Sequence, residues 1–130
     1  MHLLIVDDSE LMRKVTRLAF RGGADIEEAT NGLEALARIA TARHPFDAIV
    51  LDLQMPDMNG VEFLRALHQR PAHRDTPVVI ATSEAESSPL LHEARRLGVA
   101  AVLKKPWKPH ELSLAVEAAT RTAPPRKDTR

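Results

Sequence analysis

Residues 48–52 read AIVLD, four apolar residues that break off at a carboxylate. A short run that is apolar at every position is typical of a strand buried on both faces, as in a parallel sheet covered by helices. Ligands of such open sheets bind just beyond the carboxyl ends of the strands. Asp52 therefore stands where a ligand-binding side chain is expected.

Three further apolar runs, residues 3–6, 78–81 and 101–103, follow the same pattern. They break off at Asp7-Asp8, Thr82-Ser83 and Lys104-Lys105. Because the carboxyl ends of parallel strands lie at one edge of a sheet, we expect the carboxylates, a hydroxyl pair and a lysine to converge there. Such a set of groups suits a divalent cation and a phosphoryl group.

Helical patterns alternate with these runs, and a weaker strand is expected near residues 26–29, which predicts a doubly wound α/β sandwich. Ser9 and Ser88-Pro89 have the composition of helix starts. The apolar stripes expected to face the core are Leu11, Val15 and Leu18; Leu33, Leu36, Ala37 and Ala40; Val61, Leu64 and Leu67; Leu90, Ala94 and Leu97; and Leu112, Ala115, Val116 and Ala119.

The bulk composition is that of a single globular domain of 130 residues, which we place at residues 1–121, followed by a polar tail or linker start at residues 122–130. The 18 basic and 18 acidic residues balance, which argues against a chain built mainly to coat nucleic acid or a membrane. The chain has no cysteine, and we find no leader or membrane-spanning run, so a cytoplasmic location is expected.

Asp7 and Asp8 alone have an ordinary structural explanation, a solvated turn with an acidic residue at a helix N-terminus. Asp52 at the end of the most apolar run makes this explanation insufficient, because three converging carboxylates repel one another unless a cation neutralises them. Mg²⁺ fits, since it prefers hard oxygen ligands. An aspartate can also attack phosphorus and form an aspartyl phosphate. Lys104 or Lys105, with the Thr82 or Ser83 hydroxyl, could then bind the phosphoryl oxygens.

Five segments of the chain resemble the receiver domain of two-component response regulators, especially the stand-alone chemotaxis (CheY-like) type. They are LLIVDDS (3–9), EEATNGLEAL (27–36), DAIVLDLQMPDMNGVEFL (47–64), TPVVIATSEA (76–85) and LKKPW (103–107). The resemblance covers essentially residues 2–121. It implies five parallel strands in the flavodoxin-like order 2-1-3-4-5, flanked by five helices.

The resemblance also implies a role for each matching position. Asp52 corresponds to the phosphoacceptor, Lys105 to the lysine that pairs with the phosphoryl group, and Thr82 to the switch hydroxyl. The implied Mg²⁺ ligands are Asp8, Asp52 and the backbone carbonyl of Gln54, with Asp7 acting mainly through a coordinated water. Gln54, Ser83 and Glu84 flank the site at positions that tune the lifetime of the phosphoryl group.

In this family a histidine kinase or phosphotransfer protein donates the phosphoryl group, and the receiver itself catalyses the transfer and the later hydrolysis. The resemblance therefore implies a signalling protein and not a conventional enzyme. Phosphorylation would change a surface formed by the fourth helix, the last strand and the last helix, which a downstream protein reads. Direct binding to nucleic acid or to a membrane is not expected.

Two positions on the switch surface depart from the family pattern. Val102 stands where Tyr or Phe is frequent, and the chain has no tyrosine. Because valine is small and stiff, loop and helix shifts are expected to carry the output instead of an aromatic rotamer. Trp107 replaces the usual Phe, and packing is its plainest role.

Three alternatives to a stand-alone phosphorylation switch stay open. The first is a pseudo-receiver, an interaction module without phosphoryl chemistry, which Val102 leaves open although the acidic cluster, Thr82 and Lys105 argue against it. The second is the receiver portion of a longer regulator with a separate output domain. The third is a phosphatase of similar fold, which the LDLQMPDMNG segment (51–60) argues against.

Overall fold

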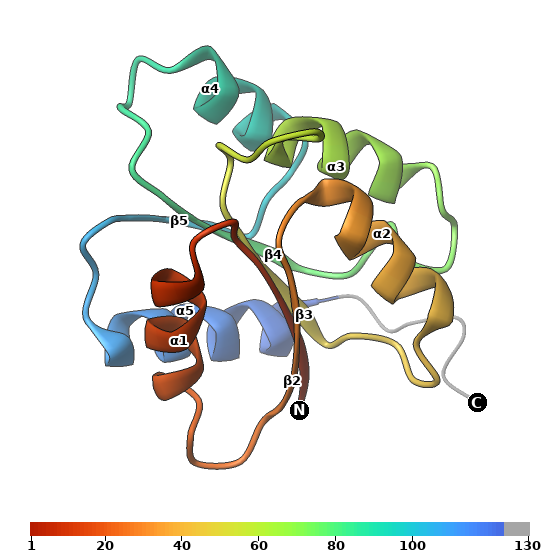
Figure 1. The fold of residues 1–130 in the computed structure, drawn as a ribbon, viewed down its shortest axis with the longest axis vertical. Helices are drawn as coiled ribbons and strands as arrows, with labels where there is room; N and C mark the ends of the chain where they lie inside the picture. Colours follow the sequence, from red (N-terminus) through yellow and green to blue (C-terminus); the bar gives the residue numbers. More distant parts are fainter. Residues whose placement is uncertain (124–130) are drawn as a thin grey trace.

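A five-stranded parallel sheet forms the centre of the computed structural model, which describes residues 1–123 (Figure 1). The strand order β2-β1-β3-β4-β5 confirms the predicted order and fold class. The strands are β1 (His2–Val6), β2 (Asp25–Ala29), β3 (Ala48–Leu51), β4 (Val78–Thr82) and β5 (Ala101–Lys104).

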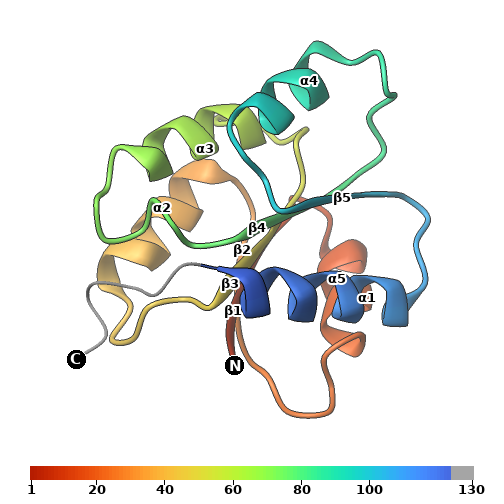
Figure 2. The same ribbon diagram turned by 180° about the vertical axis from the view of Figure 1, so that it is seen from behind.

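Helices cover both faces of the sheet, as Figures 1 and 2 show from opposite sides. α1 and α5 lie on one face, and α2, α3 and α4 lie on the other. Their bounds are α1 (Glu10–Leu18), α2 (Gly32–Thr41), α3 (Gly60–His68), α4 (Pro89–Arg96) and α5 (Pro109–Thr122). The predicted tail at residues 122–130 lies outside the described residues from position 124 onward.

Side-chain caps explain where four of the helices begin. Ser9, Asn31, Asn59 and Ser88 each occupy an N-cap and accept a hydrogen bond from a backbone N–H of the first turn. Pro89 follows Ser88 in the first turn of α4, where its missing N–H leaves no helical bond unmade. The helix starts predicted at Ser9 and at Ser88-Pro89 are thus confirmed.

The core consists of two apolar layers, one on each face of the sheet. Alternate residues of a strand point to opposite faces, so Leu4 and Ile49 contribute to one layer while Leu3 and Val50 contribute to the other. Every residue of β3 and of β4 is buried. This burial on both faces explains why the strands have continuous apolar sequences instead of alternating ones.

The apolar stripes predicted for α3 and α5 are confirmed, since Val61, Leu64 and Leu67 are buried, as are Leu112, Val116 and Ala119. On α4, Ala94 is buried as predicted, whereas Leu90 and Leu97 are half-buried and Leu91 is fully buried.

The stripes predicted for α1 and α2 are confirmed only at Val15 and Leu36, and the other predicted positions face outward. Leu11 is 67% exposed and Leu18 is 53% exposed, because α1 turns Met12, Val15 and Thr16 toward the sheet. Thr16 is buried without leaving its hydroxyl unpaired, since the hydroxyl donates to the Met12 carbonyl at 2.8 Å.

On α2, the side chains that reach the core are Ala35 and Ile39, with Leu36 packed beside them. Leu33 is 55% exposed, and Ala37 and Ala40 also face outward. The helix therefore turns Leu36 toward the core as predicted, together with Ala35 and Ile39, which were not predicted.

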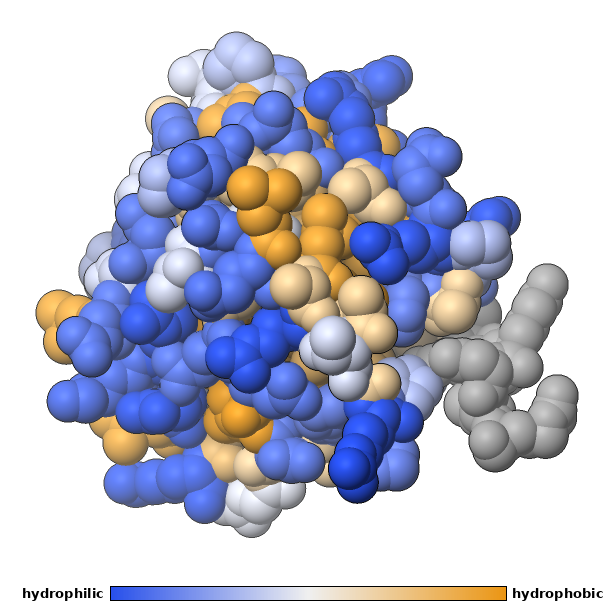
Figure 3. Space-filling model, turned by 45° about the vertical axis from the view of Figure 1, so that its right-hand side comes forward, coloured by the Kyte–Doolittle hydropathy of each residue, from blue (hydrophilic) through white to orange (hydrophobic). Residues whose placement is uncertain are grey.

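The surface is mostly hydrophilic, with a small apolar group on the face that Figure 3 turns toward the viewer. Large apolar side chains that stay exposed among residues 1–123 are Met1, Leu11, Leu18, Leu33 and Leu114. Within the same residues, no helix combines the length and the apolar character that crossing a bilayer requires.

Candidate functional site

Three carboxylates meet where β1 and β3 end. Asp7 and Asp8 follow β1, Asp52 follows the neighbouring β3, and one oxygen of each lies within 4.8 Å of the others. Asp7 and Asp52 are buried, at 5% and 8% exposure, whereas Asp8 is exposed. The convergence predicted for the three carboxylates is confirmed.

Backbone hydrogen bonds hold the buried pair in place. The Asp52 N–H donates to the Val6 carbonyl at 2.9 Å, and the Asp7 N–H donates to the Ala29 carbonyl at 3.1 Å. Each bond extends a strand ladder by one residue, so both aspartates are positioned by the sheet and not by a free loop. The rigidity of the sheet therefore carries over to the two carboxylates.

Each buried carboxylate directs one oxygen to a backbone N–H. Asp7 Oδ1 accepts from the Ser9 N–H at 2.9 Å, and Asp52 Oδ1 accepts from the Leu53 N–H at 2.8 Å. These bonds fix the rotamers of both side chains. The Oδ2 atoms are left facing a common cation.

That cation is Lys105. Its Nζ lies 3.0 Å from Asp7 Oδ2 and 3.7 Å from Asp52 Oδ2, and its side chain is 17% exposed. The Lys105 N–H donates to the Thr82 carbonyl at 2.8 Å, one step beyond the β4–β5 pairing, and the peptide bond that follows Lys105 is cis. Lys104 points elsewhere, with its Nζ 3.4 Å from Glu86 Oε2. The alternation of side chains along the strand thus separates the two lysine candidates.

Burial raises the pKa of Asp52 to about 6. The charge of Lys105 lowers this pKa, that of Asp7 raises it, and the N–H groups of Leu53 and Gln54 lower it through hydrogen bonds. Desolvation outweighs the stabilising contacts because burial removes the carboxylate from water, which disfavours its charged form. Any further positive charge near Asp52 would therefore stabilise its ionised form.

Thr82 ends β4 and is 1% exposed. Its Oγ1 accepts from the Glu84 N–H at 3.1 Å, and the Glu84 carboxylate accepts from the Ser88 hydroxyl at 2.5 Å. Ser88 in turn caps α4. A chain of three residues thus connects the end of β4 with the start of α4, while Ser83 is exposed.

The loop after Asp52 is folded tightly against it. The Gly60 N–H donates to the Leu53 carbonyl at 2.9 Å, and a Cβ at Gly60 would come within 2.6 Å of the Asp52 carbonyl oxygen. Only glycine fits this approach. Gln54 is exposed, and its N–H contacts Asp52. The Gln54 N–H thus faces the acidic cluster.

The two departures from the family pattern lie on opposite faces of the sheet. Val102 is half-buried against the layer under α2, α3 and α4, whereas Trp107 is buried in the layer under α1 and α5. The packing role expected for Trp107 is confirmed. Its Nε1 is buried and makes no hydrogen bond within residues 1–123.

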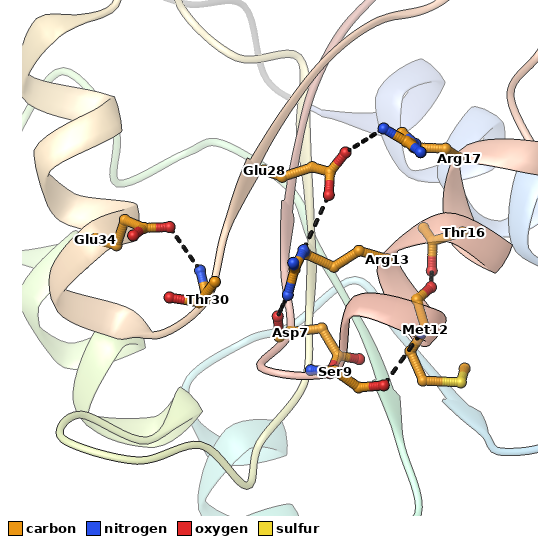
Figure 4. Close-up of polar contacts among 9 residues, drawn as sticks. All are labelled: Asp7, Ser9, Met12, Arg13, Thr16, Arg17, Glu28, Thr30 and Glu34. Atoms are coloured by element: carbon orange, nitrogen blue, oxygen red, sulfur yellow. Dashed lines mark hydrogen bonds and ion pairs between the residues drawn. The ribbon is translucent and has the colours of Figure 1, made fainter.

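Sequence reasoning missed Arg13, whose contacts appear in Figure 4. Its Nη1 donates to the Asp7 carbonyl at 2.8 Å, and its Nε donates to Glu28 Oε1 at 2.9 Å. Arg17 Nη1 donates to the other Glu28 oxygen at 2.8 Å. One signal was available: Arg13 lies one helical turn after the N-cap Ser9, hence above the end of β1.

The donor set of this site fits a magnesium ion. Asp7, Asp8 and Asp52 supply hard oxygen atoms within 4.8 Å of one another, and the exposure of Asp8 leaves a side open to water. Mg²⁺ is usually bound by one or two carboxylates together with several waters. A neighbouring lysine adds a donor for an anionic substituent, so the site can hold a cation and a phosphoryl group together.

Comparisons with known proteins agree with this geometry. A family model described as the response regulator receiver domain matches residues 3–117. A chemotaxis protein CheY homolog of Campylobacter jejuni (strain 81-176) is 31% identical over 119 residues, which are 90% of each chain. The solved structure of Vibrio cholerae chemotaxis protein CheY4 has 33% identity and a TM-score of 0.80, covering 91% of this chain and 97% of that one.

A longer relative is also similar. Transcriptional regulatory protein ResD of Bacillus subtilis (strain 168) is 34% identical over 122 residues. That stretch is 93% of this chain and 48% of ResD. The chain thus spans about half the length of that relative.

Proposed function

This chain belongs to the response regulator receiver family, and from that premise we propose that it is a phosphorylation-activated switch of two-component signalling, with Asp52 as the phosphoacceptor. The observation that carries the proposal is the contact of Lys105 with both Asp7 and Asp52 beside the third carboxylate, Asp8. A receiver domain is a signalling module and not a conventional enzyme.

The proposed chemistry is one phosphoryl transfer. A carboxylate oxygen of Asp52 attacks the phosphorus of a phosphohistidine on a histidine kinase or phosphotransfer protein. The new P–O bond forms as the P–N bond breaks, and its electron pair stays on the imidazole nitrogen, which takes up a proton. The attack needs the ionised carboxylate, and a pKa of about 6 keeps most Asp52 ionised near pH 7.

Lys105, together with a bound Mg²⁺, would balance the charge of the phosphorylated site. Asp8, Asp52 and the backbone carbonyl of Gln54 would hold the ion, and Asp7 would act mainly through a bound water. When bound, Mg²⁺ offsets the charge that builds up on the phosphoryl oxygens. Lys105 would transfer its contact from Asp7 and Asp52 to a phosphoryl oxygen as a charge-assisted bond.

The switch would begin at Thr82, whose hydroxyl turns toward the phosphoryl group. The bond from the Glu84 N–H to Thr82 then breaks, and Glu84 transmits the change to Ser88 at the start of α4. This path needs no aromatic residue at position 102. The altered face of α4, β5 and α5 would be read by a downstream protein, while Gln54, Ser83 and Glu84 set how long the phosphoryl group lasts.

The relatives support two arrangements for this switch. The CheY homolog matches this chain over 90% of both lengths and supports a stand-alone switch, for which we propose a cytoplasmic location and a protein as the downstream partner. ResD, which is about twice as long as the matched stretch, favours the receiver portion of a transcriptional regulator. Both arrangements use the same site.

The experiment is intact mass spectrometry after incubation with Mg²⁺ and acetyl phosphate. The wild type should gain one phosphoryl group, and Asp52→Asn should gain none. Asp57→Asn is the matched control, since Asp57 is an exposed aspartate of the same loop and should leave the gain intact. Removing Mg²⁺ with a chelator should abolish the reaction.

Two outcomes of this phosphorylation experiment would contradict the proposed function. If neither acetyl phosphate nor a histidine kinase phosphorylates the wild type while Mg²⁺ is bound, the chain is an interaction module without phosphoryl chemistry. Phosphorylation of Asp52→Asn to the wild-type extent would move the acceptor to another residue.

A further inference from the structure

We infer that Arg13 is a positioning residue for the metal-binding turn, acting on Asp8 through the backbone carbonyl of Asp7. The inference rests on the proposed function, because it concerns the affinity of the same site for Mg²⁺. Figure 4 displays its basis: Arg13 lies between the Asp7 carbonyl and the Glu28 carboxylate.

The Asp7 carbonyl is left without a ladder partner where β2 ends. The last bond of Asp7 toward β2 is made by its N–H, which donates to Ala29, the final residue of that strand. In a parallel pair the matching donor to the Asp7 carbonyl would be the Asn31 N–H, but Asn31 is the N-cap of α2 and makes no such bond. Arg13 Nη1 supplies the donor instead, at 2.8 Å from the Asp7 carbonyl oxygen.

The direction of this carbonyl fixes the residue that follows it. The Asp7 carbonyl and the Asp8 N–H belong to one planar peptide unit, so holding the oxygen holds the plane. The plane sets where the Cα of Asp8 lies, the atom from which its side chain leaves the backbone. Asp8 is exposed, so packing does little to hold it. Arg13 is thus the contact that orients the most weakly held carboxylate of the three.

Arg13 is itself held at two points. Its side chain is 14% exposed, and its Nε bonds Glu28 on β2 while its Nη1 bonds Asp7. A guanidinium has a planar fork that can hold two partners at a fixed angle, which an ammonium group cannot do. Arg17 bonds the same Glu28 carboxylate from an exposed position and provides a natural comparison.

A positioning role and a purely electrostatic role of Arg13 predict opposite changes in Mg²⁺ affinity when Arg13 is replaced. A cation close to a cation site repels the ion, so the loss of charge alone strengthens Mg²⁺ binding. The loss of an outer contact that orients a ligand weakens binding instead, by roughly tenfold or more. The sign of the change therefore separates the two roles.

The test is isothermal titration of Mg²⁺ into the wild type, Arg13→Gln, Arg13→Lys and the control Arg17→Gln. We expect Arg13→Gln to weaken Mg²⁺ binding about tenfold. Arg13→Lys keeps the charge and loses the fork, so it should also weaken binding. Arg17→Gln removes an equal charge and a bond to the same Glu28, and should leave the affinity unchanged.

Urea unfolding in a chelator checks that each variant is folded. If Arg13→Gln does not fold, Arg13→Lys becomes the deciding variant. Unchanged or tighter Mg²⁺ binding by the deciding variant would overturn the role of Arg13. A loss in Arg17→Gln as large as that in Arg13→Gln would also overturn it. A wild type that binds no Mg²⁺ would overturn the proposed function itself, together with this inference.

Discussion

At the scale of single residues, Gly60 shows how closely the loop after β3 is fitted to Asp52. A methyl group at this position would lie 2.6 Å from the Asp52 carbonyl oxygen and 2.8 Å from the Leu53 Cα. Both neighbours are backbone atoms, which cannot swing aside. The site therefore depends on a residue that contributes no side chain.

We predict that Gly60→Ala lowers the free energy of unfolding by about 1–3 kcal/mol, because a tightly packed backbone must shift. Phosphorylation by acetyl phosphate should also slow, since the shift moves Asp52. Urea unfolding and mass spectrometry measure the two effects. Gly22→Ala is the control, because a Cβ there meets nothing within 4 Å. Equal stability of the two variants would refute this role of Gly60.

At the scale of the elements, α4 begins at a serine that has two partners. The Ser88 hydroxyl accepts from the Leu91 N–H, as an N-cap does, and donates to Glu84. Glu84 in turn bonds Thr82 through its backbone N–H. The start of α4 is thus linked through hydrogen bonds to the end of β4.

We predict that Ser88→Ala lowers the free energy of unfolding by about 1 kcal/mol, the usual loss for an N-cap. Hydrogen exchange should also become faster at the first turn of α4. Phosphorylation should then change exchange in α4 less than in the wild type, because Glu84 has lost its partner there. Ser87→Ala, at an exposed neighbouring position, is the control. A full wild-type response in Ser88→Ala would show that the signal takes another path.

The elements also differ in how well the sequence predicts them. The buried strands were predictable, because burial on both faces demands apolar residues at every position. The faces of α1 and α2 were not, since Leu11 and Leu33 are exposed although they are leucines. Helix phase follows from the caps and from buried residues such as Thr16, whose hydroxyl is satisfied within its own helix.

The same contrast holds for the candidate site. Its acidic cluster was predictable, because parallel strands bring their carboxyl ends to one edge. The choice of Lys105 over Lys104 came from the family resemblance, and the strand geometry supplies the reason. Arg13 was missed, because its place on α1 alone does not reveal its bond to Glu28, which lies 15 residues away on β2.

At the scale of the whole molecule, the acidic site opposes the stability of the fold. Asp52 has its pKa raised from 3.8 to about 6, mainly by burial, so folding disfavours the ionised form. A raised carboxyl pKa adds stability that is fully present below pH 3.8 and is lost as the pH rises through 6. Near pH 7 the metal-free protein therefore folds against an unfavourable charge.

We predict that, in a chelator, Asp52→Asn is more stable than the wild type near pH 7. The difference should be on the order of 2–3 kcal/mol, because one unit of pKa corresponds to about 1.4 kcal/mol. The advantage should shrink as the pH falls from about 6 to 4. Urea unfolding across this range measures it, and a difference that does not vary with pH would contradict the burial of a charged Asp52.

The ion pair between Lys105 and Asp7 joins residues that are 98 positions apart. During synthesis the aspartates of β1 and β3 leave the ribosome well before Lys105 does. A nascent or proteolytically shortened chain that lacks β5 therefore has the acidic cluster without its lysine. Such a fragment lacks the one lysine that contacts both Asp7 and Asp52 among the described residues.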